Sequence, residues 1–224
     1  MADLADAAGR AVAVPLAALT RVRRAKPMHP RGAVFGAVLE RHGLGAGLGW
    51  LDATGTDDVL VRLSRGAGLP DRLPDLLGFA LRLPGDPPVD LLLSSSGRGR
   101  WTRRVPVLRR DAATPYGSIM AYRSDAGPVW LGAVPQGGPL PSDRAGLAAE
   151  APGRVVLLSA AVGRGPWQHV GTLTLGPPAD PVDPDLHFDA VLHAPPGLVT
   201  DGPMARFRRP AYAAARRARG SGER

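Results

Sequence analysis

The chain of 224 residues contains no cysteine, a single lysine and few aromatic residues, which make up 5% of the sequence. The absence of cysteine excludes disulfides, thiolate metal ligands and a thiol nucleophile. Long hydrophobic runs are missing as well. Residues 1–25 place acidic residues before a short apolar stretch, which fits neither a signal peptide nor a membrane span. We therefore expect a cytoplasmic protein without a membrane segment.

Negative charge is also scarce, because 28 Lys and Arg residues outnumber 20 Asp and Glu residues and give a formal net charge of +8. Such a balance raises nucleic acid and anionic membranes as partners. Apart from Lys26, however, every basic residue is an arginine in a background rich in alanine, glycine and proline, and the arginines are scattered except in the run 206–219. We therefore expect neither partner, and an acidic partner for residues 206–219 is kept as a third, weaker hypothesis.

Hydrophobic residues, at 44%, are numerous enough for a chain of this length to bury a substantial core. Residues 2–25 have an amphipathic helical pattern broken near Pro15, and residues 204–220 contain strong helix formers. Between them, short apolar runs are bounded by glycine, proline and aspartate, which is typical of an antiparallel sheet or barrel. The predicted strands are 33–40, 58–65, 78–85, 89–96, 118–124, 129–135, 154–163 and 169–176, and 176–187 is a predicted loop.

These elements predict an α+β chain, an antiparallel eight-stranded β-barrel with N-terminal and C-terminal helices. We divide it into an N-terminal helical arm (1–24), a barrel (25–203) and a C-terminal helix with a basic tail (204–224). No internal repeat interrupts this order.

The common reactive motifs are missing. The glycine-rich stretch 43–49 lacks the GxGxxG spacing and is not followed by a lysine, and no HExxH occurs. Ser94 and its two serine neighbours have no GxSxG context. Only His187, Asp189 and His193 have a spacing that could suit a metal, and in a proline-rich loop such residues more often face solvent.

A series of short motifs is the positive signal. In order, the chain reads HPRGAVFG from His29, VRLS at 61–64, Asp75 followed by GFALRL, VDLLLSS at 89–95, and finally FDAVLHAPPGL (188–198) and RRPAY (208–212). Each motif is short, but their order and approximate spacing resemble the core of the heme catalases over residues 25–217. The resemblance implies a catalase-type barrel that binds heme b.

The resemblance also implies how heme would be held. Tyr212 matches the tyrosine whose phenolate binds the iron, and Arg208 lies one helical turn earlier. A guanidinium beside the phenol favours its anionic form. Lys26 and Arg62 match positions that bind the heme propionates.

On the opposite side of the heme, His29 matches the histidine that takes a proton from peroxide and returns it to the departing oxygen. Ser64 would orient this imidazole by a hydrogen bond. Ser94 stands where the family has an asparagine, so its hydroxyl would contact peroxide from a shorter arm.

We therefore predict a heme-dependent peroxidase or catalase-like protein that reacts with hydrogen peroxide or organic peroxides and an unknown reducing substrate. The chain is far shorter than the true catalases, and the small catalase-like proteins of bacteria are its nearest analogue. An open pocket would favour peroxidase chemistry over rapid dismutation. The alternative is a degenerate catalase-like barrel without heme that binds a small ligand or a protein. The oligomeric state is left open, with a homodimer as one option.

Overall fold

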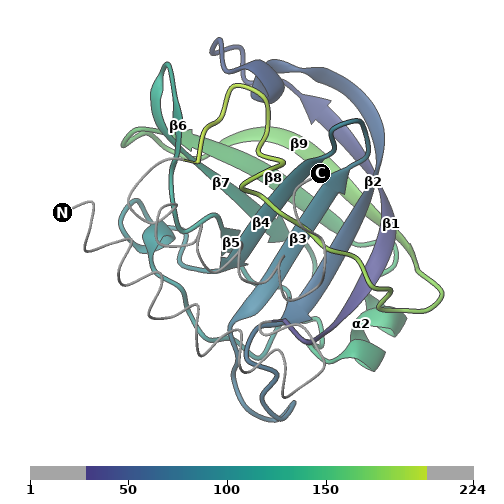
Figure 1. Ribbon diagram of the computed structural model, residues 1–224. Coiled ribbons are helices and arrows are strands. Elements are labelled where there is room, and N and C mark those ends of the chain that lie inside the picture. Colours follow the sequence, from purple (N-terminus) through teal and green to yellow (C-terminus); the bar gives the residue numbers. More distant parts are fainter. Residues whose placement is uncertain (1–28, 201–224) are drawn as a thin grey trace.

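The computed structural model describes residues 29–200, which form a single antiparallel barrel (Figure 1). Eight strands make a closed ring, since β5 pairs with both β4 and β7. A ninth strand, β6 (Tyr122–Ser124), pairs with β7 alone. The ring consists of β1 (Arg31–His42), β2 (Thr54–Arg65), β3 (Leu77–Leu83), β4 (Val89–Ser95), β5 (Tyr116–Gly117), β7 (Gly127–Pro135), β8 (Val155–Val162) and β9 (Gln168–Pro178).

The predicted eight-stranded antiparallel barrel is thereby confirmed, and one predicted strand is wrong in detail. Residues 118–124 do not form one strand, because the backbone turns at Ile119, whose φ is +59°. The chain instead pairs briefly as β5 before this turn and as β6 after it.

Helices are few in the described part of the chain. The α-helix α2 (Arg144–Glu150) follows β7, and the Asp143 side chain caps it by accepting a hydrogen bond from the Gly146 amide. Two short 3-10 helices, η1 (Gly49–Asp52) and η2 (Thr102–Arg104), lie in connections. No helix within 29–200 is long and apolar enough to cross a bilayer. Both predicted terminal helices and both predicted domain boundaries fall outside the described residues.

Inward and outward side chains alternate along the strands, and the inward ones fill the barrel interior. On β1, for example, Ala33, Phe35, Ala37 and Leu39 are buried, while Gly36, Val38 and Glu40 between them are exposed. The inward residues of the strands form one apolar cluster. A packed interior leaves no room for a large ligand. A large ligand therefore has to bind outside the barrel.

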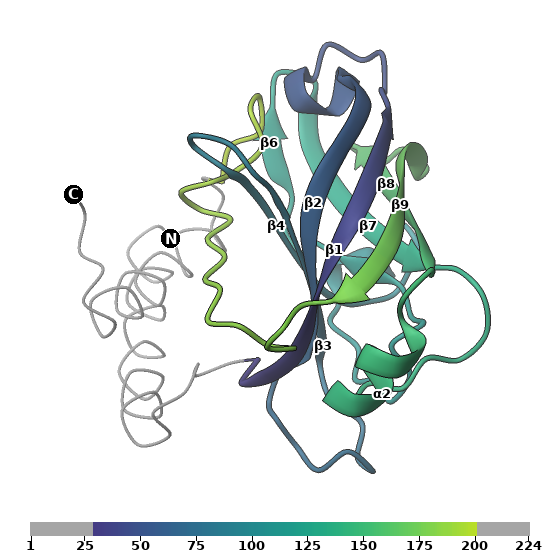
Figure 2. The ribbon, with the colours of Figure 1, turned by 90° about the vertical axis from the view of Figure 1, so that its right-hand side faces the viewer.

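The outer face of β1–β4 is crossed by residues 179–200, which we call the strap (Figure 2). Backbone hydrogen bonds join the strap to Val34 of β1, to Asp90 of β4 and to Arg123 of β6. The outward side chains of Val34 and Ala80 are only 1% and 7% exposed. The outer face is therefore covered at these two positions, whereas Gly36, Val38 and Glu40 farther along β1 are exposed.

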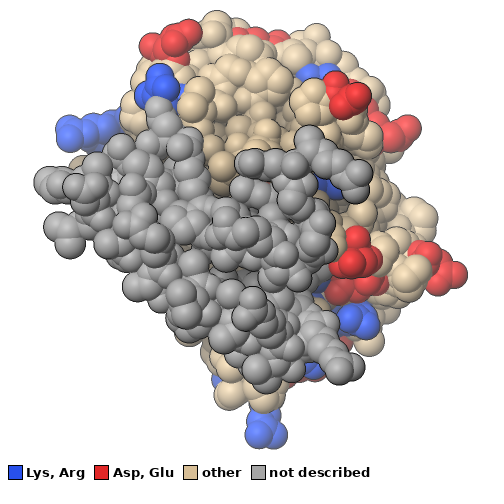
Figure 3. Space-filling model, in the orientation of Figure 1, with Lys and Arg blue, Asp and Glu red and all other residues tan. Residues whose placement is uncertain are grey.

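Charged side chains on the coloured part of this side of the molecule lie mostly at its rim, where acidic and basic residues are mixed (Figure 3). The tan surface in the upper part of this view, between those charges, shows no charged side chain. This pattern agrees with the scattered arginines of the sequence.

Candidate functional site

A row of small residues crosses the outer face of the barrel wall. Strand register places Gly32 opposite Ser64, Ser64 opposite Gly78, Gly78 opposite Ser94, and Ser94 opposite Gly117. The neighbours of these residues along each strand point into the core, so the row itself faces outward. Glycine and serine give this Gly/Ser row no bulky side chains of its own, and neighbouring groups lie over it: the Arg62 guanidinium over Gly32 and the Ser96 hydroxyl over Gly117.

His29 lies directly over the row. It precedes β1 in a left-handed conformation with φ of +56°, which is uncommon for a residue other than glycine. Its amide donates to the Gly66 carbonyl at 2.8 Å, and its Nδ1 lies 2.9 Å from the Ser64 hydroxyl oxygen. These two contacts fix both the backbone and the ring.

Gly78 makes room for this arrangement. A Cβ atom at position 78 would lie 2.4 Å from Cε1 of His29 and 2.8 Å from Oγ of Ser64. Real Cβ atoms do not approach other atoms so closely, so only glycine fits beneath the imidazole. Ser94 is the next residue in the row, on the other side of Gly78. The structure therefore brings together His29, Ser64 and Ser94, which the resemblance had selected.

Arg62 lies two residues before Ser64 on the same face of β2. Its side chain is 5% exposed and binds Asp183 of the strap through two hydrogen bonds, from Nε to Oδ1 at 2.7 Å and from Nη2 to Oδ2 at 3.0 Å. Nη2 also donates to the His29 carbonyl at 3.0 Å. Arg62 thus connects the strap to the backbone of His29. Its propionate role stays a prediction.

The other predicted heme contacts, Lys26, Arg208 and Tyr212, lie outside the described residues. The proposed iron ligand therefore stays a prediction as well. Within residues 29–200 no group of three or more His, Cys, Asp or Glu side chains could hold a metal ion.

The candidate metal residues of the strap have another role. Asp90 is fully buried and accepts hydrogen bonds from Nε and Nη2 of Arg82, both at 2.7 Å, and from the Asp189 amide at 2.7 Å. His193 Nδ1 lies 3.1 Å from the same carboxylate. The hydrogen bond to Asp90 raises the pKa of Arg82. Asp189 and His193 thus fasten the strap to β4.

Sequence reasoning missed a cluster of arginine and tryptophan. Arg103 is 1% exposed, its guanidinium lies 4.7 Å from the Trp130 ring centroid and 5.4 Å from that of Trp167, and it donates to the carbonyls of Gly163 and Gly165. Burial lowers the pKa of Arg103, and repulsion by the nearby charges of Arg104 and Arg100 lowers it further. The cluster fastens the β4–β5 connection to the turn after β8. The run WTRR at 101–104 was its only sequence signal.

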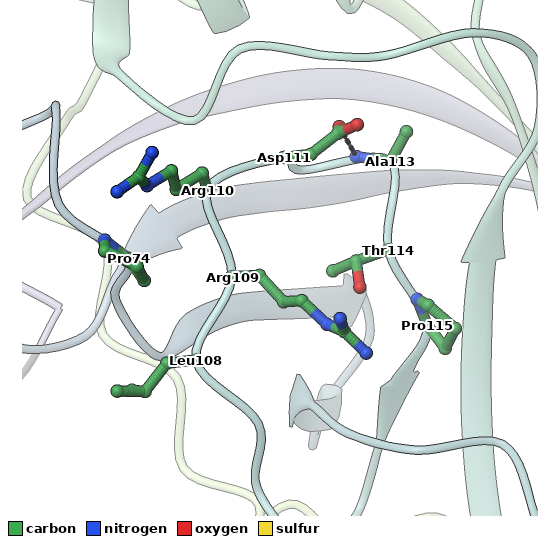
Figure 4. A pocket seen from close by; sticks show the side chains of 8 residues that line it. All are labelled: Pro74, Leu108, Arg109, Arg110, Asp111, Ala113, Thr114 and Pro115. Carbon is green, nitrogen blue, oxygen red and sulfur yellow. Dashed lines mark hydrogen bonds between the residues drawn. The ribbon is translucent and has the colours of Figure 1, made fainter.

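A hollow of about 500 Å³ lies on another part of the surface (Figure 4). The Asp111 carboxylate beside it is bonded to the amides of Ala113 and Leu140. The hollow is lined by Pro74, Leu108, Arg109, Arg110, Asp111, Ala113, Thr114 and Pro115. None of the predicted site residues is among them, so we place the functional site at the Gly/Ser row.

The fold is similar to that of solved catalases. A fungal catalase aligns with 92% of this chain and 62% of its own length, at a TM-score of 0.63 and 14% identity. Catalase A from Saccharomyces cerevisiae aligns with 90% of this chain and 63% of its own, at a TM-score of 0.57 and 11% identity. A bacterial catalase aligns with 90% of this chain and 59% of its own, at a TM-score of 0.56 and 15% identity.

No protein-family model and no curated protein sequence matches the chain. The chain spans between 59% and 63% of the length of these three catalases. The likeness is thus one of structure at low identity. It shows that the chain has the catalase β-barrel fold.

Proposed function

We propose that the protein is a heme-dependent oxidoreductase that reacts with hydrogen peroxide or organic peroxides. The observation that carries this proposal is the His29–Ser64 pair held over Gly78, with Ser94 next in the row. An imidazole whose orientation is fixed by a hydroxyl is suited to acid/base work on a small bound substrate. The catalase fold supports the same assignment.

The described residues suit one face of a porphyrin. The Gly/Ser row has no bulky side chains of its own, and the half-buried Leu92 and Ser94 lie on the same outward face of β4. Tyr212 would bind the iron, and Lys26 and Arg62 would bind propionates. When bound, heme supplies the redox chemistry of iron, which cleaves the O–O bond of a peroxide and oxidises a reductant.

The protein residues manage the proton in this proposal. When Nδ1 of His29 carries the proton and donates to Ser64, Nε2 is the basic nitrogen. His29 then takes the proton from one peroxide oxygen and returns it to the other as that oxygen leaves. Ser94 would donate a hydrogen bond to peroxide. Its short side chain reaches less far than asparagine, which favours slower, peroxidase-like turnover.

Reconstitution tests this proposal. The full chain, produced with ample heme, is expected to show a Soret band and to oxidise a dye with hydrogen peroxide or cumene hydroperoxide. His29→Gln should keep the Soret band and lose roughly 100-fold or more of the peroxide rate, the range of a general acid/base group. An unchanged rate in this variant would refute the role of His29.

A second function is favoured by one observation, the occupation of Arg62 by Asp183. A barrel whose propionate-binding arginine is already neutralised could work without heme, as a module that binds a small ligand or a protein. Protein that stays colourless with added hemin and binds no iron would select this function.

A further inference from the structure

Both partners of the Arg62–Asp183 ion pair are buried, with side chains 5% and 7% exposed. Nε and Nη2 of the guanidinium each bind one carboxylate oxygen, at 2.7 and 3.0 Å. This is the two-point geometry by which arginine recognises a carboxylate. One complete edge of Arg62 is therefore occupied by a carboxylate of the chain itself.

We propose that Asp183 is a built-in competitor for ligand carboxylates at Arg62. A ligand carboxylate can use this edge of Arg62 only after the Asp183 carboxylate leaves. Applied to heme, this inference rests on the proposed function, and the competing group is then a propionate. Asp183 would set how tightly the site holds its ligand.

The contacts of Asp183 show what its release would change. Asp183 Oδ2 also accepts a hydrogen bond from the Gly32 amide at 2.9 Å, at the end of the Gly/Ser row. Nη2 of Arg144 on α2 lies 3.6 Å from the same oxygen, and its side chain is half-exposed. Arg144 offers the displaced carboxylate a partner nearer to solvent. Exchange at Arg62 would thus loosen the strap where it meets β1.

The first experiment needs no heme. Asp183→Ala leaves Arg62 buried without its carboxylate, so we expect this variant to melt lower than the wild type and sodium propionate to restore its stability. At about 100 mM propionate the melting temperature of Asp183→Ala should rise by roughly 3–5 °C over an equal concentration of sodium chloride, as mass action predicts for a weak ligand. Wild type and Asp57→Ala, which breaks the β1–β2 ion pair with Arg41, should not respond.

The second experiment measures hemin affinity by absorbance in wild type and in Asp183→Asn, which keeps the side-chain shape and removes its charge. We expect the variant to bind hemin about tenfold more tightly or better, because the competing state is less populated. Hemin dimethyl ester has no carboxylates, so its affinity should be equal in both proteins. Asp57→Asn should bind hemin like the wild type.

The two experiments test the competitor role of Asp183 and the heme function separately. If propionate restores Asp183→Ala and no form binds hemin, Asp183 is a competitor for carboxylates and the heme function is wrong. If hemin binds wild type and Asp183→Asn equally and propionate restores nothing, the competitor is refuted and the heme function stands. Should Asp183→Ala fail to fold in every buffer, the hemin and ester titrations of Asp183→Asn decide, and equal affinities would refute the competitor.

Discussion

At the scale of single residues, the site depends on one missing side chain. The His29 ring can lie over β3 only because position 78 has no Cβ. A sequence pattern selected His29 and Ser64, but it did not reveal that Gly78 separates Ser64 from Ser94. Strand register, which sets this order, follows from pairing between distant segments.

Gly78→Ala should therefore destabilise the protein by about 1–3 kcal/mol, the usual cost of overpacking a tight site. Gly36→Ala on the same face of β1 is the matched control, since a Cβ there has nothing within 4 Å. Urea unfolding monitored by tryptophan fluorescence would measure both. Equal stability of the two variants would mean that His29 is not held over Gly78.

Tyr116 gives the barrel a predictable response to alkaline pH. Its hydroxyl donates to the Ala112 carbonyl, and burial, with a smaller contribution from Asp111, raises its pKa. An unfolded tyrosine releases its proton near pH 10, so the folded state holds more protons than the unfolded state above that pH. This contribution to stability is complete below about pH 10 and is lost as pH rises further.

Unfolding free energies measured between pH 8 and 11 should thus fall at the alkaline end. Tyr116→Phe should lose about 1 kcal/mol at pH 8, from the missing hydrogen bond, and should show a smaller alkaline decline than the wild type. Parallel curves for the two proteins would contradict the assignment to Tyr116.

At the scale of elements, the strap depends on buried carboxylates. Asp90 is fully buried and is bonded to Arg82, to the Asp189 amide and to His193. The sequence did not predict this arrangement, because Asp189 and His193 were considered only as possible metal ligands or as loop residues that face solvent. No local pattern indicates which aspartate of a proline-rich loop will meet an arginine on a strand far away in the chain.

Asp90→Ala should destabilise the chain by about 3–5 kcal/mol, since it leaves the Arg82 charge and the Asp189 amide without their partner. In Asp90→Ala, backbone hydrogen exchange should accelerate more in the strap than in β8 and β9. Asp57→Ala, which removes the half-buried partner of Arg41, is the control and should cost less than about 1 kcal/mol. Unchanged exchange in the strap of Asp90→Ala would show that Asp90 does not anchor it.

At the scale of the whole molecule, most of the barrel was predictable. Seven of the predicted strands are short apolar runs bounded by Gly, Pro or Asp, and they coincide closely with β1, β2, β3, β4, β7, β8 and β9. The closure of the barrel was not predictable from the sequence. It depends on β5, which has only two residues and whose pairing with β7 is set by the surrounding strands. The helix α2 was also missed, since its seven residues are too few for a clear amphipathic period.

The site was predictable only as far as the resemblance extends. His29, Ser64 and Ser94 were selected from motif order, and the structure gathers them on one face. Asp183 was not selected, because its role depends on the path of the strap across β1 and β2. A pairing of this kind is visible only in three dimensions.

We propose that the outer wall of β1–β4 forms one side of a heme site whose iron Tyr212 would bind. The most direct test is the absorbance spectrum of hemin titrated into wild type and Tyr212→Phe. We predict a Soret band with one hemin bound per wild-type chain, and a band that is shifted and bound at least tenfold more weakly in the variant. Identical spectra and affinities in the two proteins, or a wild type that binds no hemin, would contradict the account.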